Sequence, residues 1–147
     1  MNKTKVYLAQ TDTTVGFLSS DDKKLAQIKK RPSTQKMLQV VDSFKTLKTQ
    51  TRIPKKFRKF IRNSKNSTFI YPNNCSYRVV EKNSLHHNFI KKFGILYSTS
   101  ANITKNSFDK EYASQNCDVC IEDNLGYFES TPSNIYKINN NKIHKIR

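Results

Sequence analysis

Short apolar runs and stretches with helical spacing alternate along the whole chain. Residues 6–10 predict a short first strand, and residues 37–41 predict a buried strand. Between them we expect a helix that begins at Ser20, since serine commonly caps helix N-termini. This helix should end near Lys30, because Pro32 disfavours helical backbone at the residue before it.

The middle of the chain predicts two helices and then a pair of strands. Asp42 or Ser43 is expected to cap the first helix, and Pro54 suits the first turn of the second. Residues 68–71 and 76–80 predict paired strands, because the Asn-Asn pair between them suits a turn. Four apolar residues share one face of the second helix by their spacing: Ile53, Phe57, Phe60 and Ile61.

The last third of the chain predicts one more helix and several strands. We expect Ser84 to cap the helix and Gly94 to end it. Its apolar stripe is Leu85, Phe89, Ile90 and Phe93, and strands are predicted at 95–97, 118–121, 135–138 and 142–146. Alternating helices and strands are typical of an α/β or α+β sheet protein.

The length and composition fit a single domain over residues 1–147, with no internal repeat and no linker. Hydrophobic residues make up 35% of the chain, enough for a core, but the longest apolar runs are only a few residues. We therefore expect no membrane segment and no signal peptide. Three cysteines do not make a disulfide framework, so we expect a cytoplasmic protein.

Positive charge dominates the chain. Lys and Arg total 27 against 11 Asp and Glu, which gives a net charge of +16 and predicts an anionic partner. The abundance of Lys, Asn and Ile is also typical of an AT-rich genome. No acidic residue falls between Ser43 and Val80, however, so the basic residues are concentrated there. Candidate RNA-binding residues on the second helix are Lys55, Lys56, Arg58, Lys59 and Arg62.

Four polar or basic segments fall at predicted strand ends or loops, where sheet proteins tend to bind ligands. They are Thr11-Asp12-Thr13 with Gly16, Lys29-Lys30-Arg31-Pro32, Arg78, and Ser98-Thr99-Ser100-Ala101-Asn102. Each has an ordinary structural interpretation by itself: a capping turn, a solvated helix end or a surface ion pair. Together and in this order they are far more specific.

In that order the segments resemble the YrdC/YciO family, whose best-known members are threonylcarbamoyl-AMP synthases. The string STSAN at 98–102 matches the family without a mismatch, and Lys29 to Pro32 matches its Lys-x-Arg-Pro segment. Three further matches follow the family's order: Thr68-Phe69, Arg78-Val79 and Pro132-Ser133-Asn134-Ile135. The sequence departs from the family by lacking its opening helix and by carrying Ser64-Lys65-Asn66 in place of Pro-Gly-Pro.

This resemblance implies a twisted mixed sheet with flanking helices around a basic cavity. It also implies that ATP, L-threonine and bicarbonate give threonylcarbamoyl-AMP, which serves threonylcarbamoyladenosine modification of tRNA. Mg²⁺ is expected with ATP, held by phosphate oxygens and water rather than by a protein metal site. Possible partners are tRNA and the tRNA threonylcarbamoyl-transferase proteins.

The family's functional residues carry over onto matching positions of this chain. Those implied to bind ATP or phosphate are Lys29, Arg31, Thr68, Ser100 and Asn102. Those implied to surround threonine are Thr11, Thr13, Arg78, Ser98 and Ser133. No residue is expected to act as an acid, a base or a nucleophile, because fixed cations and positioning suffice for adenylate formation.

A second hypothesis is a non-catalytic protein of the same fold that binds tRNA or double-stranded RNA through its basic stretch. The remaining candidate chemistry has simpler interpretations. Cys117 and Cys120 form a CxxC, but the sequence offers no second pair or nearby His for a zinc site, so we expect an ordinary sheet segment. His86 and His87 are adjacent on a helix and should point in different directions.

Overall fold

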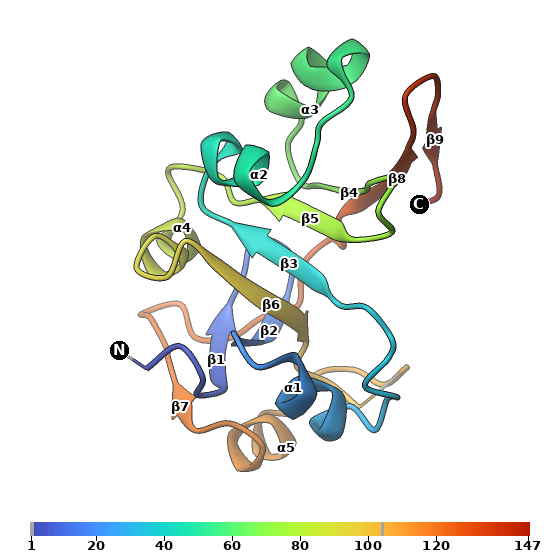
Figure 1. The fold of residues 1–147 in the computed structure, drawn as a ribbon. Coiled ribbons are helices and arrows are strands. Elements are labelled where there is room, and N and C mark those ends of the chain that lie inside the picture. Colours follow the sequence, from blue (N-terminus) through green and yellow to red (C-terminus); the bar gives the residue numbers. More distant parts are fainter. Residues whose placement is uncertain (1, 104) are drawn as a thin grey trace.

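Nine strands form one twisted, mixed sheet in the computed structural model, which describes residues 2–103 and 105–147 (Figure 1). The strands are β1 (Tyr7–Gln10), β2 (Val15–Ser19), β3 (Leu38–Val41), β4 (Ser67–Ile70), β5 (Ser76–Val79), β6 (Ile95–Ser100), β7 (Val119–Cys120), β8 (Asn134–Ile138) and β9 (Ile143–Lys145). Their order across the sheet is β7-β1-β2-β6-β3-β5-β4-β8-β9. The predicted mixed α/β class is confirmed.

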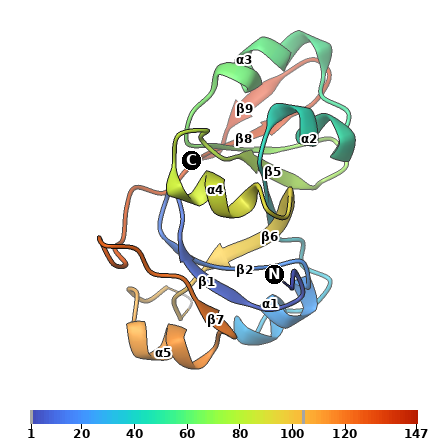
Figure 2. The ribbon, with the colours of Figure 1, turned by 90° about the vertical axis from the view of Figure 1, so that its left-hand side faces the viewer.

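Short helices pack against this sheet (Figure 2). They are α1 (Asp22–Ile28), α2 (Phe44–Gln50), the 3₁₀ helix η1 (Lys55–Phe57), α3 (Arg58–Asn63), α4 (Leu85–Ile90) and α5 (Lys110–Gln115). In both views α2 and α3 lie toward one end of the molecule, and α1 and α5 lie toward the other. Within the described residues, no helix is long and apolar enough to cross a bilayer.

Successive side chains of a strand point to opposite faces of the sheet, and different helices pack on the two faces. Val40 packs in a cluster with Phe89 and Ile90 of α4, whereas its neighbour Val41 packs with Leu47 of α2 and Ile61 of α3. Helix α4 therefore covers one face, and α2 and α3 cover the opposite face.

Helix ends follow the capping rules, with two changes. Ser43 and Ser84 accept hydrogen bonds from the backbone N–H groups of the first turns of α2 and α4, as predicted. Helix α4 ends earlier than predicted, at Ile90 with Lys91 as its C-cap; Gly94, with a φ of +81°, ends the turns that follow, and its N–H donates to the Ile90 carbonyl. Helix α1 is capped by Asp21 rather than Ser20, because the Asp21 carboxylate accepts from the N–H groups of Lys23 and Lys24.

Two expectations about apolar faces are wrong. The second basic helix is divided into η1 and α3, and Phe60 is 46% exposed although Ile53 and Ile61 are buried. Leu85 is 65% exposed, and His86 takes the inward position at the start of α4. Helix α4 has only six residues, so tertiary packing rather than the apolar pattern decides which side faces inward.

Candidate functional site

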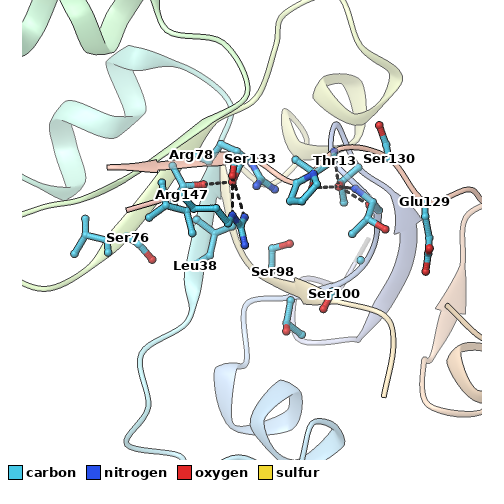
Figure 3. A pocket seen from close by; sticks show the side chains of 18 residues that line it. Thr13, Leu38, Ser76, Arg78, Ser98, Ser100, Glu129, Ser130, Ser133 and Arg147 are labelled. Atoms are coloured by element: carbon cyan, nitrogen blue, oxygen red, sulfur yellow. Dashed lines mark hydrogen bonds between the residues drawn. The ribbon is translucent and has the colours of Figure 1, made fainter. Parts of the chain in front are cut away.

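A cavity of about 480 Å³ lies on the same face of the sheet as α4 (Figure 3). The strand register explains its lining. Arg78 pairs with Val40, whose side chain packs against α4, and Ser98 pairs with Leu38 two residues earlier on β3. Residues paired in register point to the same face, so these side chains all face the cavity. The volume is within the range of small-molecule binding sites.

The turn between β1 and β2 forms one wall of the cavity. The Thr11 hydroxyl accepts hydrogen bonds from the N–H groups of Thr13 and Thr14, both at 3.2 Å, and donates to the Thr14 carbonyl. Thr11 and Thr13 hydroxyl oxygens also lie 3.2 Å apart. These bonds fix two buried hydroxyls at the cavity before any ligand arrives.

Gly16 allows this turn to pack closely against β6. A Cβ at this position would lie 3.0 Å from Cγ2 of Thr11 and 3.3 Å from the carbonyl oxygen of Thr99. Gly16 pairs with Ser100 across β2 and β6, so the glycine brings the threonine turn beside the STSAN strand. A side chain here would separate the two walls.

A third wall joins β4 to the segment before β8. The Thr68 and Ser133 hydroxyls are hydrogen-bonded at 2.9 Å and both are buried. The Arg147 guanidinium donates from Nε and Nη2 to the Ser133 carbonyl, at 3.1 and 2.9 Å. Figure 3 shows Arg147, Ser133 and Arg78 toward one side of the cavity, with Thr13, Ser130 and Glu129 toward the other.

Arg78 places a buried positive charge at the cavity. Its side chain lies on β5 and the residue is only 5% exposed. Burial lowers the pKa of the guanidinium, the Asp12 carboxylate raises it, and Arg147 lowers it further. Because Arg78 Nε has no hydrogen-bond partner among the described residues, part of its donor capacity is free for an anion.

A buried histidine lies behind this arginine. His86 Nε2 on α4 is 3.7 Å from an Asp12 carboxylate oxygen. Burial lowers the pKa of His86 to about 4; the Asp12 charge opposes this shift, whereas Arg78 and His87 add to it. At neutral pH the imidazole is therefore uncharged, which leaves the Asp12 charge to act on Arg78.

The basic segment after α1 lies at the edge of the cavity. Lys30 has a φ of +54°, and the Arg31 N–H donates to the Ala26 carbonyl, which turns the chain sharply after the helix. The Lys29 ammonium donates to the carbonyl oxygens of Ser100 and Asn102 and to Asn102 Oδ1. Burial, and then the charge of Arg31, lowers the Lys29 pKa to about 8.

The structure gathers most of the predicted ligand-binding residues around this cavity. Those that line it are Thr11, Thr13, Thr68, Arg78, Ser98, Ser100 and Ser133. Lys29, Arg31 and Asn102 do not line it. Lys29 donates to the carbonyl of the lining residue Ser100, and Arg31 Nη1 lies 3.5 Å from the hydroxyl of the lining residue Thr99. Asn102 is joined to the cavity edge through Lys29. Sequence reasoning missed Glu129, Ser130 and Arg147, which also line it.

The five candidate RNA-binding residues lie elsewhere. All are exposed on η1 and α3, and we call this surface the basic face: Lys55, Lys56, Arg58, Lys59 and Arg62. Phe69 of β4 packs beneath α3, whereas Thr68 of the same strand faces the cavity. The basic face and the cavity are therefore on opposite faces of the sheet.

No protein metal centre is found among the residues that the structure describes. There, no group of three or more His, Cys, Asp or Glu side chains could hold a metal ion. Glu129 is the acidic residue that lines the cavity, and its carboxylate already accepts a hydrogen bond from the Phe108 N–H.

Comparison with known proteins identifies relatives of this fold. The family model of Sua5, YciO and YrdC, described as telomere recombination, matches residues 1–147. No curated protein matches the chain. The H234A/Y235A variant of P. abyssi Sua5 is 13% identical, with a TM-score of 0.79 over 98% of this chain. The chain spans only 52% of that Sua5 chain.

Two further solved structures share the fold. E. coli YciO is 16% identical with a TM-score of 0.76, over 99% of this chain and 83% of YciO. P. abyssi Sua5 complexed with L-threonine is 14% identical with a TM-score of 0.74, over 97% of this chain and 50% of that one. With a family model that matches every residue from 1 to 147 and a sheet that superposes on both proteins, the chain belongs to the Sua5/YciO/YrdC family.

Proposed function

We propose that this protein is an L-threonylcarbamoyl-AMP synthase, which uses ATP, L-threonine and bicarbonate to supply tRNA threonylcarbamoyladenosine modification. The observation that carries the proposal is the lining of the cavity. All five residues assigned to threonine meet there, although they come from four separated parts of the sequence: Thr11, Thr13, Arg78, Ser98 and Ser133. The family relative solved with L-threonine adds support.

Threonine has three polar groups that this lining can recognise. A guanidinium such as that of Arg78 can bind a carboxylate with two parallel hydrogen bonds. The hydroxyls of Thr13 and Ser98 can bond the substrate amine and hydroxyl, because hydroxyls both donate and accept. The Thr11 hydroxyl is fully used by the N–H groups of Thr13 and Thr14 and by the Thr14 carbonyl, so it would position Thr13. The hydrogen bonds within the Thr11 turn hold these groups in place, which lowers the entropy lost on binding.

ATP would extend from the cavity toward α1. Ser100 lines the cavity and Lys29 holds the Ser100 and Asn102 carbonyls, so the STSAN segment is ordered beside the two cations of the Lys-x-Arg segment. Arg31 and Arg147 would stabilise charge on the phosphates. The Thr68 hydroxyl bonds the Ser133 hydroxyl, and Arg147 donates to the Ser133 carbonyl, so Thr68 lies on the same side of the cavity as Arg147. Mg²⁺ would be bound by the triphosphate oxygens and water.

The reaction joins three substrates without a covalent enzyme intermediate. The threonine amine and bicarbonate give the carbamate with loss of water, and a carbamate oxygen attacks the α-phosphorus of ATP as pyrophosphate leaves. Charge develops on the phosphoryl oxygens, where fixed cations lower the barrier most. Lys29, with a pKa near 8, regains full charge when an anion binds beside it.

Pyrophosphate release tests the proposal directly. We expect release from MgATP only when both L-threonine and bicarbonate are present, and transfer of labelled threonine to unmodified tRNA when the transferase proteins are added. Lys29→Ala and Asn102→Ala should reduce both signals by about 10-fold, the effect of losing roughly one hydrogen bond near the phosphates. Lys23→Ala is the matched control, because Lys23 is an exposed lysine on α1, the helix that Lys29 follows, and it should retain full activity.

The outcome that rejects the proposal is a folded protein without this dependence. If ATP and threonine raise the melting temperature but no pyrophosphate forms, the cavity binds its ligands without catalysing their reaction. If neither ligand raises it and no pyrophosphate forms, the cavity has another occupant.

RNA binding through the basic face is a second candidate function. The five cations make no ion pair with a carboxylate among residues 2–103 and 105–147. Unpaired surface cations favour polyanions, since their release of counterions drives association. The position of this surface opposite the cavity allows both activities in one molecule.

Salt dependence distinguishes this candidate. For tRNA, the logarithm of the association constant should fall linearly with the logarithm of salt concentration. Lys59→Gln should reduce the slope by about 1 if this residue contacts a phosphate. An affinity that does not change with salt would exclude the basic face as an RNA-binding surface. A matched control is Lys23→Gln on α1, which should leave the slope unchanged.

A further inference from the structure

The CxxC segment brings two thiols into contact. Cys117 follows α5, Cys120 ends β7, and their sulfur atoms are 3.1 Å apart. The predicted sheet segment is present as β7, and the fold adds this contact between the two sulfur atoms. A disulfide bond is about 2.05 Å long, so the sulfurs need to approach by only about 1 Å to be joined.

Backbone contacts hold this arrangement in place. Asp118 lies between the two cysteines, and its carboxylate accepts from the Val6 N–H at 2.8 Å. The Asp118 N–H donates to the Val6 carbonyl at 2.8 Å, and Cys120 pairs with Leu8 on β1. The segment between the two thiols is thus fixed to Val6, just before β1, and to Leu8 within it. Cys117 packs against the cluster that holds both Val6 and Leu8, so the two cysteines lie on the same face of the sheet.

The two thiols differ in environment. Cys120 is exposed, whereas Cys117 is half-buried and packs against the apolar cluster of β1 and β2. Burial, and then contact with Cys120, raises the pKa of the Cys117 thiol to about 12. An exposed thiol can reach a dissolved disulfide, so Cys120 is placed to react first and Cys117 to react second.

We propose that Cys117 and Cys120 are a redox site that forms a reversible intramolecular disulfide with a small-molecule disulfide as oxidant. The Cys120 thiolate attacks one sulfur of glutathione disulfide and expels one glutathione thiolate, which leaves a mixed disulfide. Once Cys120 is in the mixed disulfide, the contact that helped to raise the Cys117 pKa is lost; the Cys117 thiol gives up its proton as it attacks Cys120 Sγ and expels the second glutathione. Two cysteines lose two electrons, one disulfide gains them, and the two thiol protons pass to the two departing thiolates.

A metal site is not the better assignment for this pair. Two thiolates supply half of a tetrahedral zinc shell, and the residues that the structure describes contain no third His, Cys, Asp or Glu placed to join them. Exchange between two thiols requires no further ligand, which agrees with the surroundings.

Cys75 provides an internal control. It lies in the turn between β4 and β5, and four strands separate β5 from β7 in the sheet. Its sulfur is 3.5 Å from the Lys36 ammonium and is placed to contact neither thiol of the pair. An oxidation that depends on thiol proximity should therefore leave Cys75 reduced.

To test this, the full chain is equilibrated with glutathione buffers of increasing oxidised fraction and the exchange is quenched with acid. Free thiols are then alkylated, and the masses of the intact protein and of its peptides are measured. We expect two of the three thiols to become resistant to alkylation together, in a peptide that holds both cysteines and is lighter by two hydrogen atoms. Excess dithiothreitol should restore all three. In the Cys75→Ser variant, Cys117 and Cys120 should become resistant to alkylation just as they do in the wild-type protein.

The single variants separate the two steps. Cys117→Ser should accumulate glutathione on Cys120, and Cys120→Ser should form no internal disulfide. The proposal is overturned if three thiols stay alkylatable at every buffer ratio, if the wild-type protein keeps a stable glutathione adduct, or if the disulfide involves Cys75 or a second molecule.

Discussion

The cavity and the basic face carry positive charge in opposite ways. Arg78 at the cavity and Lys29 at its edge are each only 5% exposed, whereas the five cations of the basic face are all exposed. A buried cation costs desolvation free energy, but an exposed cation costs almost none. Buried charge therefore indicates a bound anion more strongly than the larger number of surface lysines does.

The two regions also differ in how their side chains are held. At the cavity, hydroxyls, carbonyls and guanidinium groups are linked by hydrogen bonds across β1, β4, β6 and the end of the chain. On the basic face, Arg62 lies over the Phe44 ring at 4.9 Å, and Lys56 donates to the Asn141 carbonyl. A hydrogen-bonded set of groups suits a small ligand of fixed shape, and a row of exposed cations suits a long polyanion.

The largest effect is expected at Arg78. Arg78→Gln keeps a polar side chain but removes the charge, and charge-assisted hydrogen bonds to a carboxylate contribute about 3 kcal/mol. Threonine-dependent pyrophosphate release should fall about 100-fold. Arg62→Gln makes the same change on the basic face and should retain full release. Equal losses in the two variants would contradict the assignment of charge to the cavity.

The buried histidine behind the cavity should make stability depend on pH. The His86 pKa is about 4 in the folded protein and about 6.5 when unfolded, so the unfolded chain binds more protons between these values. The contribution of His86 to the free energy of unfolding is therefore fully present above pH 6.5. It decreases as the pH falls toward 4, by at most about 3 kcal/mol. Urea unfolding at pH 7 and pH 4.5 measures the loss.

His86→Gln provides the comparison for this titration. The variant lacks the ionisable ring, so its stability should change less between the two pH values, even if it is less stable at both. Asp12, Arg78 and His87 face the ring and remain in place. The same pH-dependent loss in variant and wild type would mean that His86 does not control it.

Gly16→Ala tests the close approach of the cavity walls. The added methyl group would meet Thr11 Cγ2 at 3.0 Å and the Thr99 carbonyl at 3.3 Å, so the turn must shift away from β6. Overpacking of this kind costs about 1–3 kcal/mol. We expect a lower urea midpoint and a raised KM for threonine. An unchanged KM would show that the turn position is not critical for the substrate.

The smallest effect is expected from single changes on the basic face. Lys59→Ala removes an exposed side chain without an ion-pair partner among the described residues, so the free energy of unfolding should change by less than about 0.5 kcal/mol. Pyrophosphate release should be unchanged. A large loss of either would mean that the basic face supports the cavity through the sheet.

Local rules predicted the ends of several elements because their causes lie within a few residues. Ser43 and Ser84 act through hydrogen bonds at their own helix ends, and Gly94 acts through its φ angle in the turn after α4. The Asn139 side chain accepts from the N–H groups of Asn141 and Lys142 in the turn between β8 and β9, which is also a local contact. Such signals do not depend on the rest of the fold.

Two elements had no local signal. All residues of β2 are buried, so its sequence lacks the alternation that indicates a strand. Helix α5 has six residues with Ala113 as its buried position, which is too short and too polar for helical spacing to be recognised. Leu85 is exposed and His86 is buried for a related reason, since a short helix can rotate about its axis to suit the residues that pack against it.

The sequence by itself determined the family, the alternation of helices and strands, and most residues of the candidate site, because motifs and caps are written in neighbouring positions. Only the tertiary structure decided that Thr11, Ser98 and Ser133 share one cavity, that Arg147 joins them, and that the basic face lies on the opposite side. Strand order and register join residues that are far apart in sequence, and these depend on packing of the whole sheet.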